Sequence, residues 1–383
     1  MRRWVLGLSL LLLSACAGTP KQAEVARLFH NELFRPARDE IDPAKVFALS
    51  PEMRRYLDVE AAARFAELGK RAGLVDALYS QSKLKLEYDS EMTRNAAEAF
   101  AARSGNCLSL VIMTAAFAKA MGLSVRFQRY SADPMLGRQD ELQFSIDHVN
   151  LTLDTRQPDP SWSHLPLDPL TIDFAPPEDL RGLRMRAISE QTVVAMYLNN
   201  RAAESLAQDR IDEAYWWARS ALLADPGFTA AYNTLGVIYH QHGHLAQAEA
   251  ALAAALEREP GNTQVIHNLA GTLSALGRDS EAAALQQRLA QLDPEPAFSF
   301  FDRGVAAMKA GDFKRARELF AREVDRAPYY HEFHFWLALA HYELGDLPTA
   351  KAQLTLAREH STTSQDRQRY SAKIEHLKRL SAP

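Results

Sequence analysis

The residue in this sequence best suited to covalent chemistry is Cys107, one of only two cysteines in 383 residues. It follows Gly105-Asn106 and directly precedes a helix-length apolar run. The positive end of a helix macrodipole favours the thiolate, which is the nucleophilic form of cysteine. The other cysteine, Cys16, directly follows the N-terminal leader, and we expect no disulfide partner for Cys107 within the chain. We interpret Cys107 as a candidate nucleophile; the alternative is a small buried side chain without a chemical role.

A candidate base and two candidate acids follow Cys107 along the chain. An activated cysteine needs a base within hydrogen-bond reach and a third group that holds the base. His148 is the candidate base, because apolar neighbours in a strand-like run would shield it from bulk water, although such a histidine equally suits a core position. For the third role we prefer Asp173, central in a short strand-like run, over Asp168, which is flanked by prolines. An aspartate on a neighbouring strand can fix the imidazole tautomer.

Bringing these residues together requires a buried helix followed by strands. The segment 108–121 is apolar nearly all round and is followed by Gly122, which predicts a buried helix. The hydropathy then alternates with a period of two over 123–130 and 142–153, and 170–174 is a shorter third run. A buried helix followed by an antiparallel sheet is an α+β core.

The order of these residues resembles that of the transglutaminase-like cysteine domains, which are related to papain. The resemblance covers about 85–180 and is most specific at 105–107, where the helix begins. It implies that Cys107 attacks an amide carbonyl, that His148 passes the proton to the leaving amine, and that Asp173 orients the imidazole. Water as the resolving nucleophile gives peptidase or amidase activity, which we favour over transamidation by an amine.

Two features depart from the family pattern. Asn150 stands where the family usually has an aromatic residue, and the connection from His148 to the aspartate is long; both weaken the assignment of Asp173. The resemblance also implies an oxyanion site made by the backbone N–H of Cys107 and an upstream side chain. The candidates for that side chain are Tyr88, Gln81 and Asn95.

The second half of the chain repeats with a period of about 34 residues. Small residues let two helices approach, glycine allows a tight turn between them, and proline ends the second helix. The pattern resembles the tetratricopeptide repeat, and we predict an all-α solenoid of about five units over 195–364 with a polar capping helix over 365–383. The series are Ala214, Ala248, Ala282, Ala316 and Ala350; Gly243, Gly277, Gly311 and Gly345; Pro226, Pro260, Pro294 and Pro328; and Ala202, Gly236, Ala270, Gly304 and Ala338.

Stacked repeats of this kind form a concave surface suited to an extended peptide or a partner's helix. We therefore expect a protein or peptide partner. No pattern predicts a cofactor, and His240, His242 and His244 fit a solvated turn better than a metal site. Because the net charge is mildly negative and no basic stripe is present, nucleic-acid binding is not predicted.

The N-terminus has the three zones of an export signal. Arg2 and Arg3 precede an apolar core of roughly 10 residues, too short to cross a bilayer, and small residues precede Cys16. This leader, 1–15, resembles that of bacterial lipoproteins, which implies lipidation of Cys16 and anchoring to a membrane. The absence of aspartate at the second mature position implies the outer membrane, facing the periplasm. The alternative is an ordinary secretory signal with an incidental cysteine.

The predicted division of the chain continues with a helical segment over 16–84, the transglutaminase-like domain over 85–180 and a linker over 181–194. The predicted protein is an envelope lipoprotein with cysteine-dependent acyl-transfer activity on amide bonds, whose repeats recruit a partner. The alternative is a non-catalytic assembly or scaffold lipoprotein in which the transglutaminase-like domain is inactivated.

Overall fold

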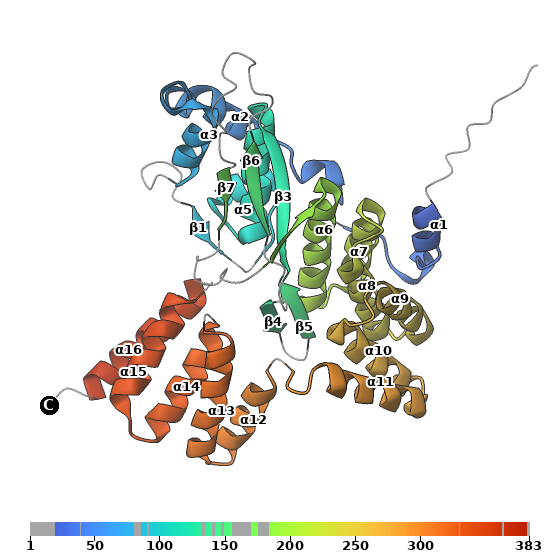
Figure 1. Ribbon diagram of the computed structural model, residues 1–383, viewed down its shortest axis with the longest axis vertical. Coiled ribbons are helices and arrows are strands. Elements are labelled where there is room, and N and C mark those ends of the chain that lie inside the picture. The colour runs from blue at the N-terminus through green and yellow to red at the C-terminus, as the bar shows by residue number, and fades with distance from the viewer. Residues whose placement is uncertain are drawn as a thin grey trace, which may run out of the picture.

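An α+β part is followed by a long helical array in the computed structural model (Figure 1). The elements of the α+β part surround one apolar helix, and the array begins at Glu190. The residues that the structure describes are 20–38, 40–79, 86–89, 92–131, 135–139, 142–146, 149–154, 170–174, 184–296, 298–328, 330–361 and 364–380. Among them, no helix is both long and apolar enough to cross a membrane.

The central helix α5 (Cys107–Ala120) is buried along almost its whole length, as its apolar sequence predicts. Asn106 caps its N-terminus, and a tight turn with Gly122 at φ 75° ends it. The chain then enters β3 (Ser124–Ser131), which runs back along α5. The predicted helix and the first predicted strand are therefore present.

In the part of the chain that the structure describes, four antiparallel strands form the sheet that packs on α5, in the order β7-β6-β3-β8. Their bounds are β6 (Val149–Asp154), β7 (Leu170–Ile172) and β8 (Arg184–Ile188). The sequence predicts a linker over 181–194, but the structure places β8 there, paired with the second edge of β3, and begins the first array helix at Glu190. An unpaired edge of β3 would leave its backbone groups without partners, and β8 satisfies them.

A separate hairpin is formed by β4 (Met135–Gln139) and β5 (Leu142–Ile146). The predicted single strand over 142–153 is therefore two strands in different sheets, β5 and β6. The alternating pattern specifies an extended chain but not which neighbour it pairs with, so a change of partner inside one run leaves no mark in the sequence.

Helices over 43–79 cover the other side of α5. They are η2 (Pro43–Lys45), α2 (Pro51–Arg55), η3 (Tyr56–Glu60) and α3 (Ala62–Tyr79). The ring of Tyr56 packs against Phe117 of α5, and its hydroxyl donates to the Ala77 carbonyl at 2.9 Å. This layer closes the core around the helix that carries Cys107.

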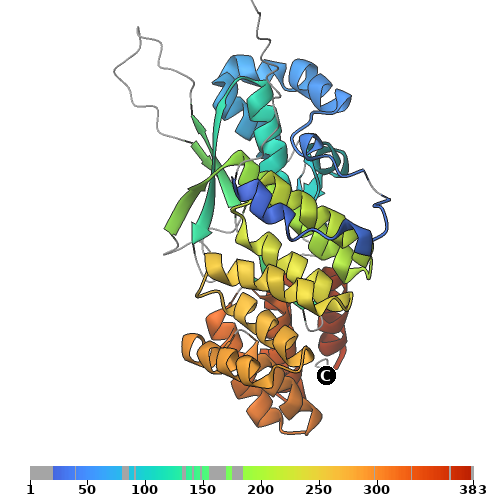
Figure 2. The ribbon, with the colours of Figure 1, turned by 90° about the vertical axis from the view of Figure 1, so that its right-hand side faces the viewer.

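The N-terminal segment, 20–38, lies instead along the array (Figure 2). It contains α1 (Pro20–Ala26) and η1 (Asn31–Leu33). Phe34 stacks on Tyr215 with ring centroids 3.9 Å apart, and the Tyr239 hydroxyl donates to the Leu28 carbonyl at 2.7 Å. The indole N–H of Trp216 in the array donates to the Arg35 carbonyl of this segment.

Among the residues that the structure describes, the array consists of five helix pairs and one closing helix. Small residues sit where the paired helices cross: a Cβ at Gly304 would lie 2.6 Å from the Phe320 ring. Gly243 takes a positive φ in its turn, and Asp209 takes the equivalent place in the first repeat with φ 59°. The bounds are α6 (Glu190–Ala207), α7 (Ile211–Ala224), α8 (Thr229–Gln241), α9 (Leu245–Arg258), α10 (Thr263–Ala275), α11 (Asp279–Leu292), α12 (Ser299–Lys309), α13 (Phe313–Arg326), α14 (His331–Glu343), α15 (Leu347–Glu359) and α16 (Ser364–Leu380).

Stacking is interrupted between α11 and α12 (Figure 1). Successive helices pack on each other from α6 to α11 and from α12 to α16, whereas α11 and α12 make at most a marginal contact among the described residues. Leu292, at the end of α11, is 49% exposed. Arg303 on α12 holds the repeat position of Leu235 and Leu269, so an apolar contact is missing there. The array therefore comprises a first block, 190–292, and a second block, 298–380, which has its own cores.

Candidate functional site

Cys107 is the first residue of α5, and only 4% of it is exposed. The Asn106 side chain accepts a hydrogen bond from the Ser109 backbone N–H at 2.9 Å, which fixes the first turn of the helix. Gly105 is required immediately before it, because a Cβ there would lie 2.6 Å from the Ser109 Cβ. The thiol is thus held at the positive end of a buried helix dipole.

Tyr88 is the candidate oxyanion donor that the structure places beside Cys107. It belongs to β1 (Glu87–Tyr88), which pairs in parallel with β2 (Ser104–Gly105), so that Tyr88 lies opposite Gly105. The Tyr88 hydroxyl lies close to the backbone N–H and the thiol of Cys107. Burial, and then the adjacent Cys107 thiol, raises the pKa of Tyr88, so the phenol stays protonated and can donate at neutral pH.

The other two candidate oxyanion donors do not share this position. Asn95 caps α4 (Ala96–Ala102), where its side chain accepts from the Glu98 N–H at 3.0 Å. Gln81 lies outside the described residues.

A second polar group surrounds Asp173, directly after β7. Its Oδ2 accepts hydrogen bonds from the Tyr130 hydroxyl at 2.8 Å and from the Asn150 amide at 2.9 Å. Burial, together with the hydrogen bond to Asp173 and its charge, raises the pKa of Tyr130 to about 12. The carboxylate is therefore held by two neutral donors from the adjoining strands β3 and β6.

Tyr130 and Asn150 are residues that sequence reasoning did not assign to the site. In the sequence analysis, Asn150 is a departure from the family pattern. In the structure, its amide donates a hydrogen bond to Asp173. The strand register carries the signal: Leu151 pairs with Ile172, so Asn150 and Asp173 come opposite each other. This contact between Asn150 and Asp173 can be predicted only when it is known which strands pair.

The group around Cys107 and the group around Asp173 lie at the same end of the helix–sheet layer. Since β3 runs back along α5, β6 is antiparallel to β3, and β7 is antiparallel to β6, the starts of α5 and β6 and the end of β7 are neighbours. His148 comes immediately before β6. His148, the alternative acid Asp168 and the lipidation candidate Cys16 all lie outside the described residues.

The two groups are on different faces of the sheet. Val149 and Leu151 pack in the same core as α5, so Asn150 between them points to the other face, where it binds Asp173. A base that serves both Cys107 and Asp173 must therefore bridge the end of the sheet. Among the described residues, no cluster of three or more histidine, cysteine or acidic side chains could hold a metal ion.

Comparison with protein families supports the reading of the array. The tetratricopeptide repeat model matches residues 240–299 and, in a second version, 301–361. The chain carries tetratricopeptide repeats over 240–299 and 301–361. The predicted repeats are thereby confirmed for this region. No curated protein matches the sequence.

Solved structures with the same repeats are similar to the array. The tetratricopeptide-repeat protein YrrB, which has an unusual peptide-binding site, is 19% identical, covering 45% of this chain and 89% of its own with a TM-score of 0.26. The protein TTC0263 of Thermus thermophilus is 19% identical, covering 46% and 97%, with a TM-score of 0.30. The pilF protein of Pseudomonas aeruginosa is 19% identical, covering 50% and 94%, with a TM-score of 0.29.

Proposed function

We propose that this chain is an envelope lipoprotein in which Cys107 catalyses acyl transfer at amide bonds and the repeats recruit a protein or peptide partner. The observation that carries the proposal is the buried Cys107 thiol at the start of α5, with Tyr88 held beside it by the pairing of β1 with β2. A helix start, a protonated phenol and a nearby carboxylate together suit nucleophilic catalysis. The direct test is the pH dependence of Cys107 alkylation.

In the proposed reaction His148 takes the proton of the Cys107 thiol, and the sulfur attacks the carbonyl carbon of a bound amide. The negative oxygen of the tetrahedral intermediate is held by the Cys107 N–H and the Tyr88 hydroxyl. The C–N bond then breaks while His148 returns the proton to the leaving amine, which leaves a thioester. Asp173 would orient the imidazole through its second oxygen, Oδ1.

Water is the nucleophile that we propose resolves the thioester. His148 removes a proton from the water, the hydroxide adds to the carbonyl, and the C–S bond breaks to regenerate the thiol and release a carboxylic acid. An amine in place of water would give transamidation with the same groups. Water is present at far higher concentration, which favours peptidase or amidase activity.

Partner recruitment is assigned to the solenoid, and the second block offers a clean test. Deleting 293–383 should leave Cys107 alkylation by iodoacetamide within about twofold of the full chain, since the first block packs with the α+β part in one core. The same deletion should abolish recovery of the natural partner in cross-linking with the Cys107→Ala chain. Cutting earlier, before α8, would also remove Tyr239, which holds the N-terminal segment.

The partner model fails if the truncated chain, shown by circular dichroism to be folded, recovers the same partner as the full chain. Loss of alkylation in the folded truncated chain would instead show that the second block supports the site itself.

Lipid anchoring has its own test at Cys16. Cys16→Ser removes the thiol that would carry the acyl chains, so the protein should move from the membrane fraction to the soluble periplasmic fraction. The measurement is fractionation followed by immunoblotting, with the wild-type chain alongside. Membrane association of Cys16→Ser that survives a high-salt wash would refute the anchor.

A further inference from the structure

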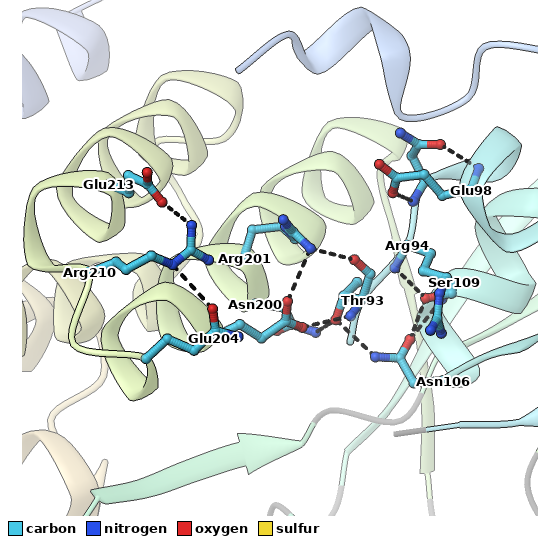
Figure 3. A network of polar contacts seen from close by, with 12 residues as sticks. Thr93, Arg94, Glu98, Asn106, Ser109, Asn200, Arg201, Glu204, Arg210 and Glu213 are labelled. Carbon is cyan, nitrogen blue, oxygen red and sulfur yellow. Dashed lines mark hydrogen bonds and ion pairs between the residues drawn. The ribbon is translucent and has the colours of Figure 1, made fainter. Parts of the chain in front are cut away.

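The first helix of the array reaches the start of the helix that carries Cys107 (Figure 3). Thr93, which is 1% exposed, lies between the two. Its backbone N–H donates to Glu204 Oε1 on α6 at 2.7 Å, and its carbonyl accepts from Arg201 at 3.4 Å. On the other side it contacts Asn106, the N-cap of α5.

The hydroxyl oxygen of Thr93 accepts a hydrogen bond on each of its two lone pairs. Its oxygen accepts from the Asn106 amide at 2.8 Å and from the Asn200 amide at 3.2 Å. The Glu204 carboxylate, which accepts from the Thr93 N–H, also lies near this hydroxyl. Because a carboxylate only accepts, the hydroxyl proton must point to Glu204 and both lone pairs to the amides.

The orientation of Asn106 satisfies both of its neighbours, since the Ser109 backbone N–H can only donate and the Thr93 hydroxyl oxygen accepts. Its NH₂ group donates to Thr93, so its Oδ1 faces α5, where it accepts from the Ser109 N–H at 2.9 Å and the Ser109 hydroxyl at 2.8 Å. The Arg94 N–H completes the set by donating to the Ser109 oxygen at 2.8 Å. Asn106 thus donates to Thr93, and Thr93 in turn donates to Glu204, so each hydrogen bond polarises the next.

We propose that Glu204, on the first helix of the repeat array, is a positioning residue for Cys107 and acts through Thr93 and Asn106. The inference rests on the proposed function, since it concerns the reactivity of that thiol. It makes the first repeat part of the acyl-transfer machinery rather than an appended binding module. The array and the nucleophile are then coupled through one buried hydrogen-bond chain.

The charge of Glu204 is what sets the direction of this chain. Burial raises the pKa of Glu204, while the hydrogen bond from the Thr93 N–H, the nearby Thr93 hydroxyl and the charges of Arg201 and Arg94 act in the opposite sense. A neutral glutamine of the same shape can still accept from the Thr93 N–H, but its own NH₂ would face the Thr93 hydroxyl. That hydroxyl would then meet three donors with two lone pairs, and the hydrogen bond that ties the Asn106 amide to Thr93 would weaken.

The test compares Cys107 alkylation by iodoacetamide at pH 6 and pH 8 in the full chain. In Glu204→Gln the rate at pH 6 should fall roughly fivefold relative to wild type, as expected for the loss of one N-cap interaction at the helix start, with little change at pH 8. Thr93→Val, which removes the hydroxyl, should have the same effect. Thr93→Ser, which keeps it, should restore the wild-type profile.

Glu213→Gln is the matched control, because Glu213 is a buried carboxylate on α7 that pairs with Arg210. Equal shifts in Glu204→Gln and Glu213→Gln would overturn the inference, as would unchanged profiles in both Glu204→Gln and Thr93→Val. A wild-type chain that alkylates like an isolated thiol would overturn the proposed function itself. Unfolding temperatures of all variants separate loss of positioning from loss of fold.

Discussion

Replacing Asp173 by asparagine should lower the rate of amide cleavage by roughly 10³–10⁴-fold, as loss of a triad acid does elsewhere. The structure dictates the reason. Tyr130 and Asn150 both donate to Oδ2, so the carbonyl oxygen of the new asparagine must take that position and its NH₂ the position of Oδ1. A donor at Oδ1 cannot accept from the imidazole, and His148 would be held in the wrong tautomer.

The measurement is the rate of amine release from peptide anilides that the wild-type chain turns over. Two matched variants accompany Asp173→Asn. Asp168→Asn should change the rate far less, and Tyr130→Phe, which removes one donor to Oδ2 and leaves the other, should cost less than about tenfold. A larger effect of Asp168→Asn would transfer the orienting role to Asp168, and small equal effects of both would remove the triad.

The array was the part of the fold that the sequence predicted best, because each repeat makes its own local contacts. Gly304 meets Phe320 within one helix pair, so the need for a small residue recurs at a fixed spacing. The break between α11 and α12 could not be seen in the same way. The spacing continues through it, and the change lies in side-chain chemistry such as Arg303 in place of an apolar residue.

The site was accessible only in part. Cys107 at a helix start follows from the apolar run after it, and the structure has α5 beginning there. The partners of Asp173 could not be predicted, because Tyr130, Asn150 and Asp173 meet only when β3, β6 and β7 are in register. Glu204 was equally hidden, since it bonds to a residue more than 100 positions earlier in the chain.

The N-terminal segment shows the same limit. Its helical propensity and its prolines predict several short helices. They do not predict which part of the protein those helices pack against. Phe34 and Leu28 are held by Tyr215 and Tyr239 of the first block, so the segment after the proposed lipid anchor lies against the array. Contacts between residues so far apart in the sequence depend on the assembled fold rather than on the local sequence pattern.

The central claim is that Cys107 is an activated nucleophile with His148 as its base. Alkylation by iodoacetamide requires the thiolate, and between pH 8 and pH 6 the thiolate fraction of an isolated thiol falls roughly 80-fold. A thiol held as an ion pair with an imidazolium at a helix start keeps its thiolate through this range. His148→Ala removes the partner, so it should restore a steep dependence on pH, while Cys107→Ala identifies the labelled residue.

The deciding measurement is therefore the ratio of Cys107 alkylation rates at pH 8 and pH 6, in the wild-type chain and in His148→Ala. The account predicts a wild-type ratio below about 5 and a ratio for His148→Ala that rises toward the isolated-thiol value of roughly 80. A steep wild-type ratio that His148→Ala leaves unchanged would contradict it, and the chain would then be a repeat scaffold whose cysteine domain has no catalytic role.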